Sequence, residues 1–221
     1  MVKKTSLLIF FIIFSFIDVW MLYIGDKDLL FLPRVLSLFA LLCYGYLSIK
    51  MVTKKMYLLG FFILSTGVLF SLDDYTILGM VSLVALRISW LSVLVSYKEK
   101  SDPKVVLMVF ILAIVLISIV LYSMYVDTLF FYLSVLTTLS LLLLLAFSFS
   151  NALTLSPKFG NKEMFIAVVI FFLSDALSGA KKIEGTSTFF LILSVVLYNV
   201  AYFFLINAFI KKDEKVFPSV S

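Results

Sequence analysis

Two aspartates lie in stretches that are otherwise apolar. Asp175 falls in "FFLSDALSGA" (171–180), and Asp74 ends "VLFSLDD" (68–74). A carboxylate at the centre of a bilayer costs about 2.5–3.5 kcal/mol on insertion scales, so it normally faces the interior of a helix bundle or a watered cavity. Asp175 is therefore a candidate functional residue, the alternative being a polar contact between helices. Asp74 lies beside a short loop, where it could instead be solvated or cap the next helix.

Further polar side chains stand in apolar runs. Arg87 lies in "LVALRISWLSV", where a buried guanidinium needs an anion. It either pairs with an aspartate to hold helices together or grips a phosphate headgroup with two parallel hydrogen bonds. Tyr198 and Tyr202 share one helix face at a spacing of four, with Asn199 beside them. These three residues either form packing contacts between helices or bind a substrate.

Residue types that are missing narrow the chemistry. The chain has no histidine, which removes Ser-His and Cys-His nucleophiles, HExxH zinc sites and haem with a histidine ligand. Hydrolysis would have to use carboxylates, Tyr, Lys or Arg. Cys43 is the single cysteine, so no disulfide forms within the chain. The sequence holds no glycine-rich phosphate loop, metal-ligand cluster or GxSxG motif, and we expect no cofactor and no metal.

Composition indicates a membrane protein. The chain of 221 residues is 63% hydrophobic and 14% charged, with a mean hydropathy of +1.18. Soluble domains are about 45–50% apolar and about 25% charged. The net charge of +5 comes from basic residues scattered through short loops, so it indicates membrane topology and not nucleic-acid binding. The expected partners are membrane lipids, and the sequence leaves the oligomeric state open.

The hydropathy pattern predicts an all-α, polytopic membrane bundle of about eight transmembrane helices. Spanning helices need about 20 apolar residues. We expect one transmembrane domain over 1–210 and a disordered cytoplasmic tail over 211–221, and we expect the first window to be retained as a helix and not cleaved as a signal peptide. Seven helices is the competing count, because "DDY" barely separates two windows. The eight windows are 5–24, 29–49, 56–73, 76–97, 104–123, 127–149, 163–180 and 187–210.

Basic residues predict the orientation. With the N-terminus inside, thirteen Lys residues fall on the cytoplasmic side and four basic residues, Lys27, Arg34, Lys181 and Lys182, fall on the other. The positive-inside rule then places both termini in the cytoplasm, with a plasma or bacterial inner membrane as the default. All four prolines are expected at helix starts or in loops.

An internal repeat is a further hypothesis. "VLFSLDD" (68–74) and "VIFFLSD" (169–175) share Val, Phe, Leu and Asp in register. The third and seventh windows run in the same direction, which fits two parallel four-helix repeats. Four such matches also arise by chance in a chain rich in Leu and Phe, so both readings stay open.

These stretches resemble the YhhN family of membrane proteins, which includes the lysoplasmalogenases. The resemblance rests on "FSLDD" (70–74), "IAVVIFFLSDALSGA" (166–180) and "YNVAYFFLI" (198–206), and it extends over most of the chain. The sequence differs from the family pattern at three places. Leu32 stands where a Lys precedes Pro, Asp73 replaces a glycine, and Arg87 falls at a histidine.

The resemblance implies hydrolysis of the vinyl ether bond of lysoplasmalogens, with Asp74 and Asp175 as catalytic residues and a lysophospholipid as substrate. One carboxyl group would protonate the alkene carbon, and the second, ionised, would stabilise the resulting cation or activate water, as in glycoside hydrolysis. We expect Asp175 to be the acid and Asp74 the base, although the reverse assignment stays open. A small membrane transporter and a non-catalytic protein with a YhhN-like fold are the alternatives, and the headgroup is not specified by the sequence.

Overall fold

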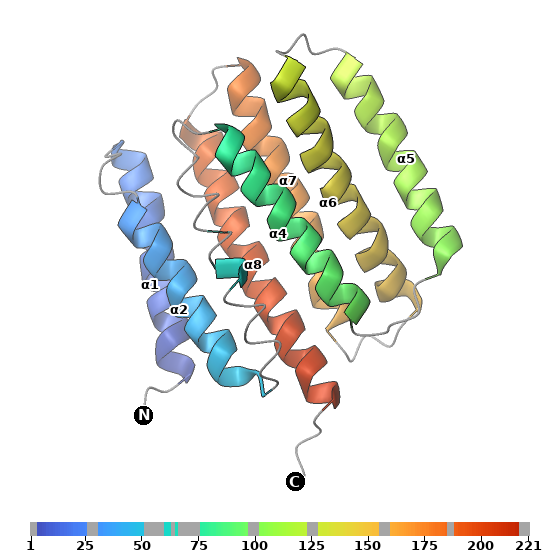
Figure 1. The fold of residues 1–221 in the computed structure, drawn as a ribbon. Coiled ribbons are helices and arrows are strands. Elements are labelled where there is room, and N and C mark those ends of the chain that lie inside the picture. Colours follow the sequence, from blue (N-terminus) through green and yellow to red (C-terminus); the bar gives the residue numbers. More distant parts are fainter. Residues whose placement is uncertain are drawn as a thin grey trace. The chain divides into compact units, whose positions relative to one another are not determined.

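The computed structural model describes residues 4–25, 31–50, 60–62, 65, 76–96, 102–122, 128–154, 160–184 and 188–216. In these residues the regular structure is helical, so the all-α class is confirmed. Figure 1 shows the helices, which are numbered with a gap because the segment between α2 and α4 is described only at 60–62 and 65. Their bounds are α1 Lys4–Ile24, α2 Phe31–Ser48, α4 Thr76–Ser96, α5 Pro103–Tyr122, α6 Thr128–Thr154, α7 Asn161–Glu184 and α8 Thr188–Val216.

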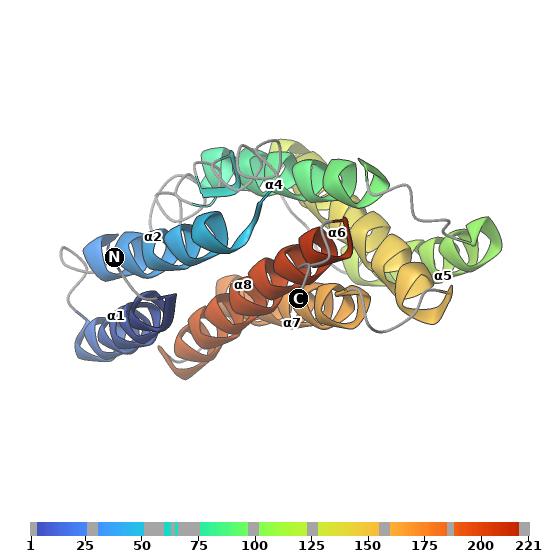
Figure 2. The ribbon, with the colours of Figure 1, turned by 90° about the horizontal axis from the view of Figure 1, so that it is seen from below.

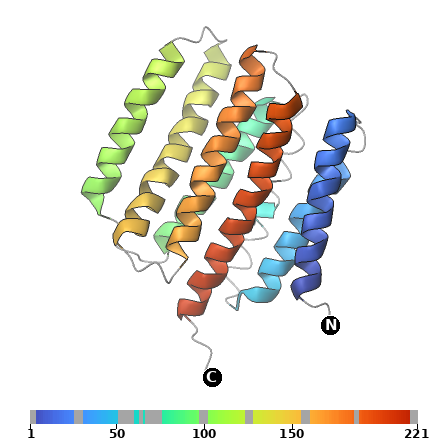
Figure 3. The same cartoon turned by 180° about the vertical axis from the view of Figure 1, so that it is seen from behind.

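The helices group into two compact units. Unit 1 comprises Met1–Phe62 and Lys158–Ser221, and unit 2 comprises Ile63–Pro157. In unit 1, α7 packs along α8, α1 packs along α2, and both α1 and α2 contact α8 (Figures 1 and 3). In unit 2, α4 and α5 each pack on α6. The single domain expected over 1–210 stays a prediction.

Three of the described helices are long and apolar enough to cross a membrane. They are Lys4–Ile24, Val135–Leu153 within α6, and Thr188–Asp213 within α8. These three helices support the membrane class predicted from composition. The predicted number of eight spanning helices stays a prediction. Shorter apolar helical stretches lie at Leu32–Ser48, Gly79–Ser92 and Pro103–Leu112.

Helix α1 shows the surface expected of a lipid-facing helix. Its outward face carries Ile9, Ile13, Phe16 and Trp20, all of which are exposed. Large apolar side chains exposed in a continuous stripe would be a liability in water, because monomeric soluble proteins rarely expose such patches. In a bilayer the same stripe faces lipid tails.

Prolines and an acidic cap mark helix starts. Pro33 is the third residue of α2 and Pro103 the first of α5, as predicted, while Pro157 and Pro218 lie outside the described residues. Asp102 Oδ1 accepts the N–H of Lys104 at 2.9 Å, which caps α5. The N–H of Asp102 donates to Ser150 Oγ at 2.8 Å and ties this cap to the end of α6.

The disordered tail predicted for 211–221 is wrong for its first six residues, because α8 continues to Val216. The physical reason is that the polar side chains there have partners inside unit 1. Lys212 is fully buried and donates from Nζ to Asn161 Oδ1 at 2.6 Å. Asp213 Oδ2 accepts the N–H of Lys50 at 2.7 Å, just past the end of α2. Residues 217–221 lie outside the described part of the chain.

Helix α7 begins in close contact with α8. Gly160 has a φ of 75°, and its carbonyl accepts the N–H of Met164 at 3.0 Å, so it caps the helix. A Cβ at this position would stand 2.5 Å from the carbonyl oxygen of Ala208. Glycine is required here both by the left-handed backbone and by the closeness of the two helices.

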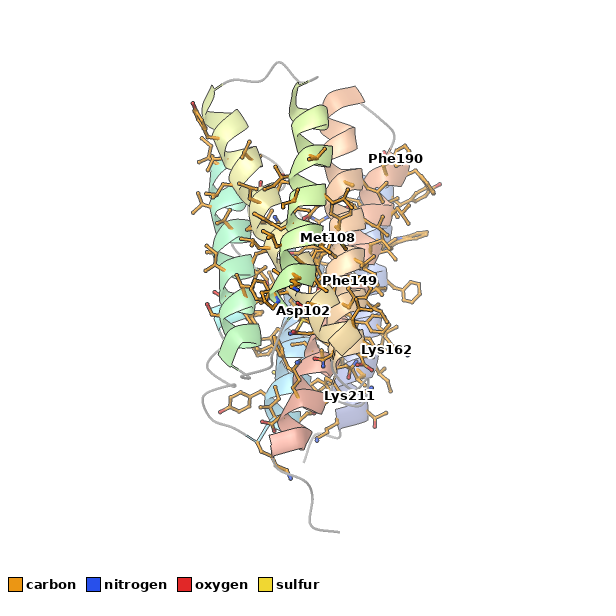
Figure 4. The ribbon with its side chains drawn as sticks, turned by 90° about the vertical axis from the view of Figure 1, so that its right-hand side faces the viewer. Asp102, Met108, Phe149, Lys162, Phe190 and Lys211 are labelled. Carbon is orange, nitrogen blue, oxygen red and sulfur yellow. The ribbon has the colours of Figure 1, made fainter. Side chains whose placement is uncertain are left out.

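The ends of unit 1 differ in character. Lys162 and Lys211 lie near one another at one end, and Phe190 lies toward the other (Figure 4). Lys211 pairs with Glu163 of α7. Seen from below, the start of α1 and the end of α8 are both toward the viewer, at this same charged end of unit 1 (Figures 1 and 2).

Candidate functional site in the α7–α8 seam

A pair of serines joins α7 to α8 next to Asp175. Ser174 Oγ donates to the Ser194 carbonyl at 2.9 Å, and Ser194 Oγ donates to the Ser174 carbonyl at 3.0 Å. The two hydroxyl oxygens lie 3.1 Å apart, and both serines are buried. Each hydroxyl thus reaches a carbonyl of the opposite helix, which sets the register of the seam at the turn that carries Asp175.

One helical turn away, the two predicted tyrosines form an aromatic cluster with Phe171. The ring of Phe171 meets Tyr198 at 5.3 Å and Tyr202 at 5.2 Å, edge to face in both cases. The hydroxyls of Tyr198 and Tyr202 are 3.1 Å apart and hydrogen-bonded to each other. The prediction that the two tyrosines share one helix face is correct. In the structure this face contacts α7.

Asn199 has a buried side chain with a hydrogen-bond donor that is not satisfied by the described residues. The side chain is 8% exposed, and its Nδ2 has no hydrogen-bond partner among the described residues. An unpaired buried amide costs about 1–3 kcal/mol. Such a group in a membrane helix marks a place where a polar ligand or a water would be stabilised.

Asp175 itself is half-buried on α7. It follows Ser174 directly and lies four residues after Phe171, so it shares the α8-facing side of α7 with them. Asp175 also takes part in a further interaction within the protein. Asp175 therefore lies on α7 and Tyr198, Asn199 and Tyr202 lie on α8, and the two tyrosines contact α7 through Phe171.

Arg87 belongs to unit 2. It is buried in α4, and its Nη1 donates to the backbone carbonyl of Thr137 in α6. The same carbonyl accepts Ser140 Oγ at 2.7 Å. This bond gives Arg87 a role in joining α4 to α6, and the phosphate-binding role predicted from the sequence stays a prediction.

Asp74 and Asp73 lie outside the described residues, as does the whole of 68–74. The second predicted catalytic acid and the first half of the predicted repeat are therefore not placed by the structure. Among the residues that are described, no group of His, Cys, Asp and Glu side chains is arranged to hold a metal ion.

Sequence reasoning missed a buried ion pair between α1 and α2. Arg34 Nε donates to Asp18 Oδ1 at 2.7 Å, and the two side chains are 7% and 2% exposed. Arg34 was predicted on the outer side within the window 29–49, and it lies in the first turn of α2, but its pairing with Asp18 was not predicted. The signal that could have found it is the pairing of a lone acid and a lone base sixteen residues apart in a helical hairpin.

Neither a family model, nor a curated protein, nor a solved structure matches this chain.

Proposed function

We propose that this chain is an integral-membrane hydrolase of the lysoplasmalogenase type, which cleaves the vinyl ether bond of a lysophospholipid with Asp74 and Asp175. The observation that carries the proposal is Asp175 on the same side of α7 as Phe171, one turn away along that helix, where the ring of Phe171 packs on Tyr198 and Tyr202 of α8. The sequence resemblance supplies the reaction class.

The seam offers the parts that this chemistry needs. A carboxyl group within an apolar helix can remain protonated and deliver its proton to the alkene carbon. Aromatic rings nearby provide an apolar wall for the alkenyl chain, and the ring faces of Tyr198 and Tyr202 favour a developing cation. The Nδ2 of Asn199, which has no hydrogen-bond partner in the part of the chain that the structure describes, can donate to a substrate oxygen. Asp74 is the proposed second carboxylate.

The proposed topology has eight spanning helices, with both termini in the cytoplasm and the protein in the plasma or bacterial inner membrane. Two parallel four-helix repeats remain part of this proposal. The start of α1 and the end of α8 lie at the same end of unit 1, which supports placing both termini on one side (Figure 1). A thiol placed at Lys4 in a Cys43→Ser background should be inaccessible to an impermeant reagent added outside cells, and labelling from outside would contradict the orientation.

The test is aldehyde release from a lysoplasmalogen by the purified protein. The parent is expected to release aldehyde, and Asp175→Asn and Asp74→Asn are expected to lose the activity while keeping helix content. Ser92→Ala is a suitable control, because Ser92 is exposed and its hydroxyl, among the residues described, bonds the carbonyl of Ile88 in its own helix. Unchanged turnover in both Asp variants would exclude the proposed chemistry.

A non-catalytic membrane protein is the second candidate. It is favoured by Arg87, whose bond to the Thr137 carbonyl is a helix-to-helix contact of the kind that holds membrane bundles together. No aldehyde release by the correctly folded parent from any lysoplasmalogen headgroup would favour this candidate.

A further inference from the structure

In the Asp18–Arg34 pair, the guanidinium group of Arg34 bonds Asp18 through Nε. Within the described residues, the hydrogen bond of the guanidinium is the one from Nε to Asp18 Oδ1, at 2.7 Å. The edge formed by Nη1 and Nη2, with four N–H groups, is not bonded to Asp18. The backbone carbonyl of Arg34 accepts Ser37 Oγ at 2.8 Å, so the backbone at this position is held within α2.

This edge, for which the described residues provide no partner, has a chemical preference. A guanidinium is planar and always charged, and two of its N–H groups match the oxygen spacing of a phosphate or carboxylate. Because Asp18 holds Nε, the plane of the guanidinium group is held in one orientation. The side chain of Arg34 is 7% exposed, so a partner would be bound largely out of water.

The depth of the pair is indicated by aromatic side chains on α1. Trp20 and Tyr23 are 60% and 71% exposed, and their rings lie 6.1 Å apart. Trp20 is the last residue of the apolar stripe of α1 and Tyr23 follows it, close to the end of the helix at Ile24. Exposed Trp and Tyr at the end of a spanning helix are typical of the level of lipid headgroups.

Asp18 lies two residues before Trp20, which is about 3 Å along the helix axis. The ion pair is therefore close to the headgroup level and not at the bilayer centre. The abundant anion at that level is the phosphate of phospholipids.

We propose that the Nη1–Nη2 edge of Arg34, held in place by Asp18 at Nε, binds the phosphate group of a membrane phospholipid where α1 ends and α2 begins. This site lies on different helices from the α7–α8 seam and does not depend on the proposed hydrolysis. The shared chemistry is phosphate recognition, and a free phosphate ion is the other source that the experiment must separate.

The test uses the fact that Arg34 and Arg87 are the only two arginines in the sequence. Full-length protein with ¹⁵N-labelled arginine side chains is reconstituted in phosphatidylglycerol membranes in a buffer without phosphate. Solid-state NMR then measures the dipolar coupling between the Nη nitrogens and lipid ³¹P. We expect coupling at the Arg34 signal, which is identified by its absence in Arg34→Lys. Coupling at neither arginine, or at Arg87 alone, would overturn the proposal.

A second arm separates the two phosphate sources. The same protein is placed in a phosphorus-free glycolipid membrane with inorganic phosphate added. Equal coupling to inorganic phosphate at Arg34 would assign the site to a free ion and overturn the lipid assignment.

A binding measurement provides an independent check. By native mass spectrometry, Arg34→Lys is expected to bind phosphatidylglycerol about tenfold more weakly or worse, because a charge-assisted hydrogen bond is lost while the positive charge remains. Lys162→Gln removes an exposed positive charge from the opposite end of unit 1 and should leave the affinity unchanged. Equal weakening in both variants would show non-specific charge attraction and contradict the proposal.

Discussion

Ser174 on α7 and Ser194 on α8 exchange hydrogen bonds with one another's backbone carbonyls, at 2.9 and 3.0 Å. The pair lies in the seam at the turn that carries Asp175. It fixes how far α7 can slide along α8, and so sets which α8 side chains Asp175 can approach.

Removing one serine of this pair should weaken the seam. Ser194→Ala is expected to reduce the free energy of unfolding by about 0.6 kcal/mol, and by up to about 1.7 kcal/mol, the range measured for hydrogen bonds between membrane helices. Denaturant titration in mixed micelles measures this loss. Ser92→Ala should leave the free energy nearly unchanged, and an equal loss in that control would remove the link to the α7–α8 contact.

Two glycines with positive φ should respond differently to alanine. Gly25 has a φ of 83° with nothing within 4 Å of a notional Cβ, whereas at Gly160 the Cβ would stand 2.5 Å from the Ala208 carbonyl oxygen. Gly25→Ala should cost about 1–2 kcal/mol for the left-handed backbone alone. Gly160→Ala should cost more, because α7 and α8 must also separate. Thermal unfolding of the two variants side by side measures the difference, and equal costs would contradict the close approach.

Removing only one partner of the buried hydrogen bond between Lys212 and Asn161 should lower the free energy of unfolding. Asn161→Leu removes the oxygen that Lys212 Nζ bonds at 2.6 Å, and hydrogen bonds to charged groups contribute about 1.5–3 kcal/mol. Adding Lys212→Met should recover part of the stability, because a buried charge that has lost one of its hydrogen-bond partners destabilises more than an apolar side chain of similar size. A double-mutant cycle on the free energy of unfolding measures the coupling, and additive losses would argue against it.

The two tryptophans should report lipid exposure separately. Trp20 is 60% exposed on α1, and Trp90 is 1% exposed on α4. In membranes that contain brominated lipids, fluorescence of the Trp90→Phe variant should be strongly quenched, because bromine reaches Trp20. The Trp20→Phe variant should be quenched weakly. The reverse order would place the outward face of α1 away from lipid.

The helical class and most helix positions could be predicted from hydropathy, because apolar windows of about 20 residues are a direct consequence of bilayer thickness. Helix ends were less accurate. The predicted end at 210 stopped before the first lysine of "KKDEK", whereas the structure continues α8 to Val216. Hydropathy treats Lys212 as solvated, and it cannot register that Asn161 Oδ1 accepts a hydrogen bond from Lys212 Nζ.

The site was predicted only as far as residue type and helix face allow. Tyr198 and Tyr202 share a face because they are four residues apart, and that is a local property. The pairing of Ser174 with Ser194, and of Asp18 with Arg34, depends on the register of two packed helices. A sequence pattern contains no distance between helices, so charge and spacing could suggest the Asp18–Arg34 pair but could not give the geometry of either contact.

The measurement that tests the central claim most directly is deuterium incorporation during turnover in D₂O. Protonation of a vinyl ether at carbon, followed by water addition and collapse of the hemiacetal, leaves one solvent-derived hydrogen on the carbon next to the aldehyde. We predict that the parent protein releases an aldehyde with a single deuterium at that carbon, trapped at once as a hydrazone, and that Asp175→Asn releases none. Aldehyde without deuterium, or equal release by the variant, would contradict the assignment of Asp175 as an acid–base residue.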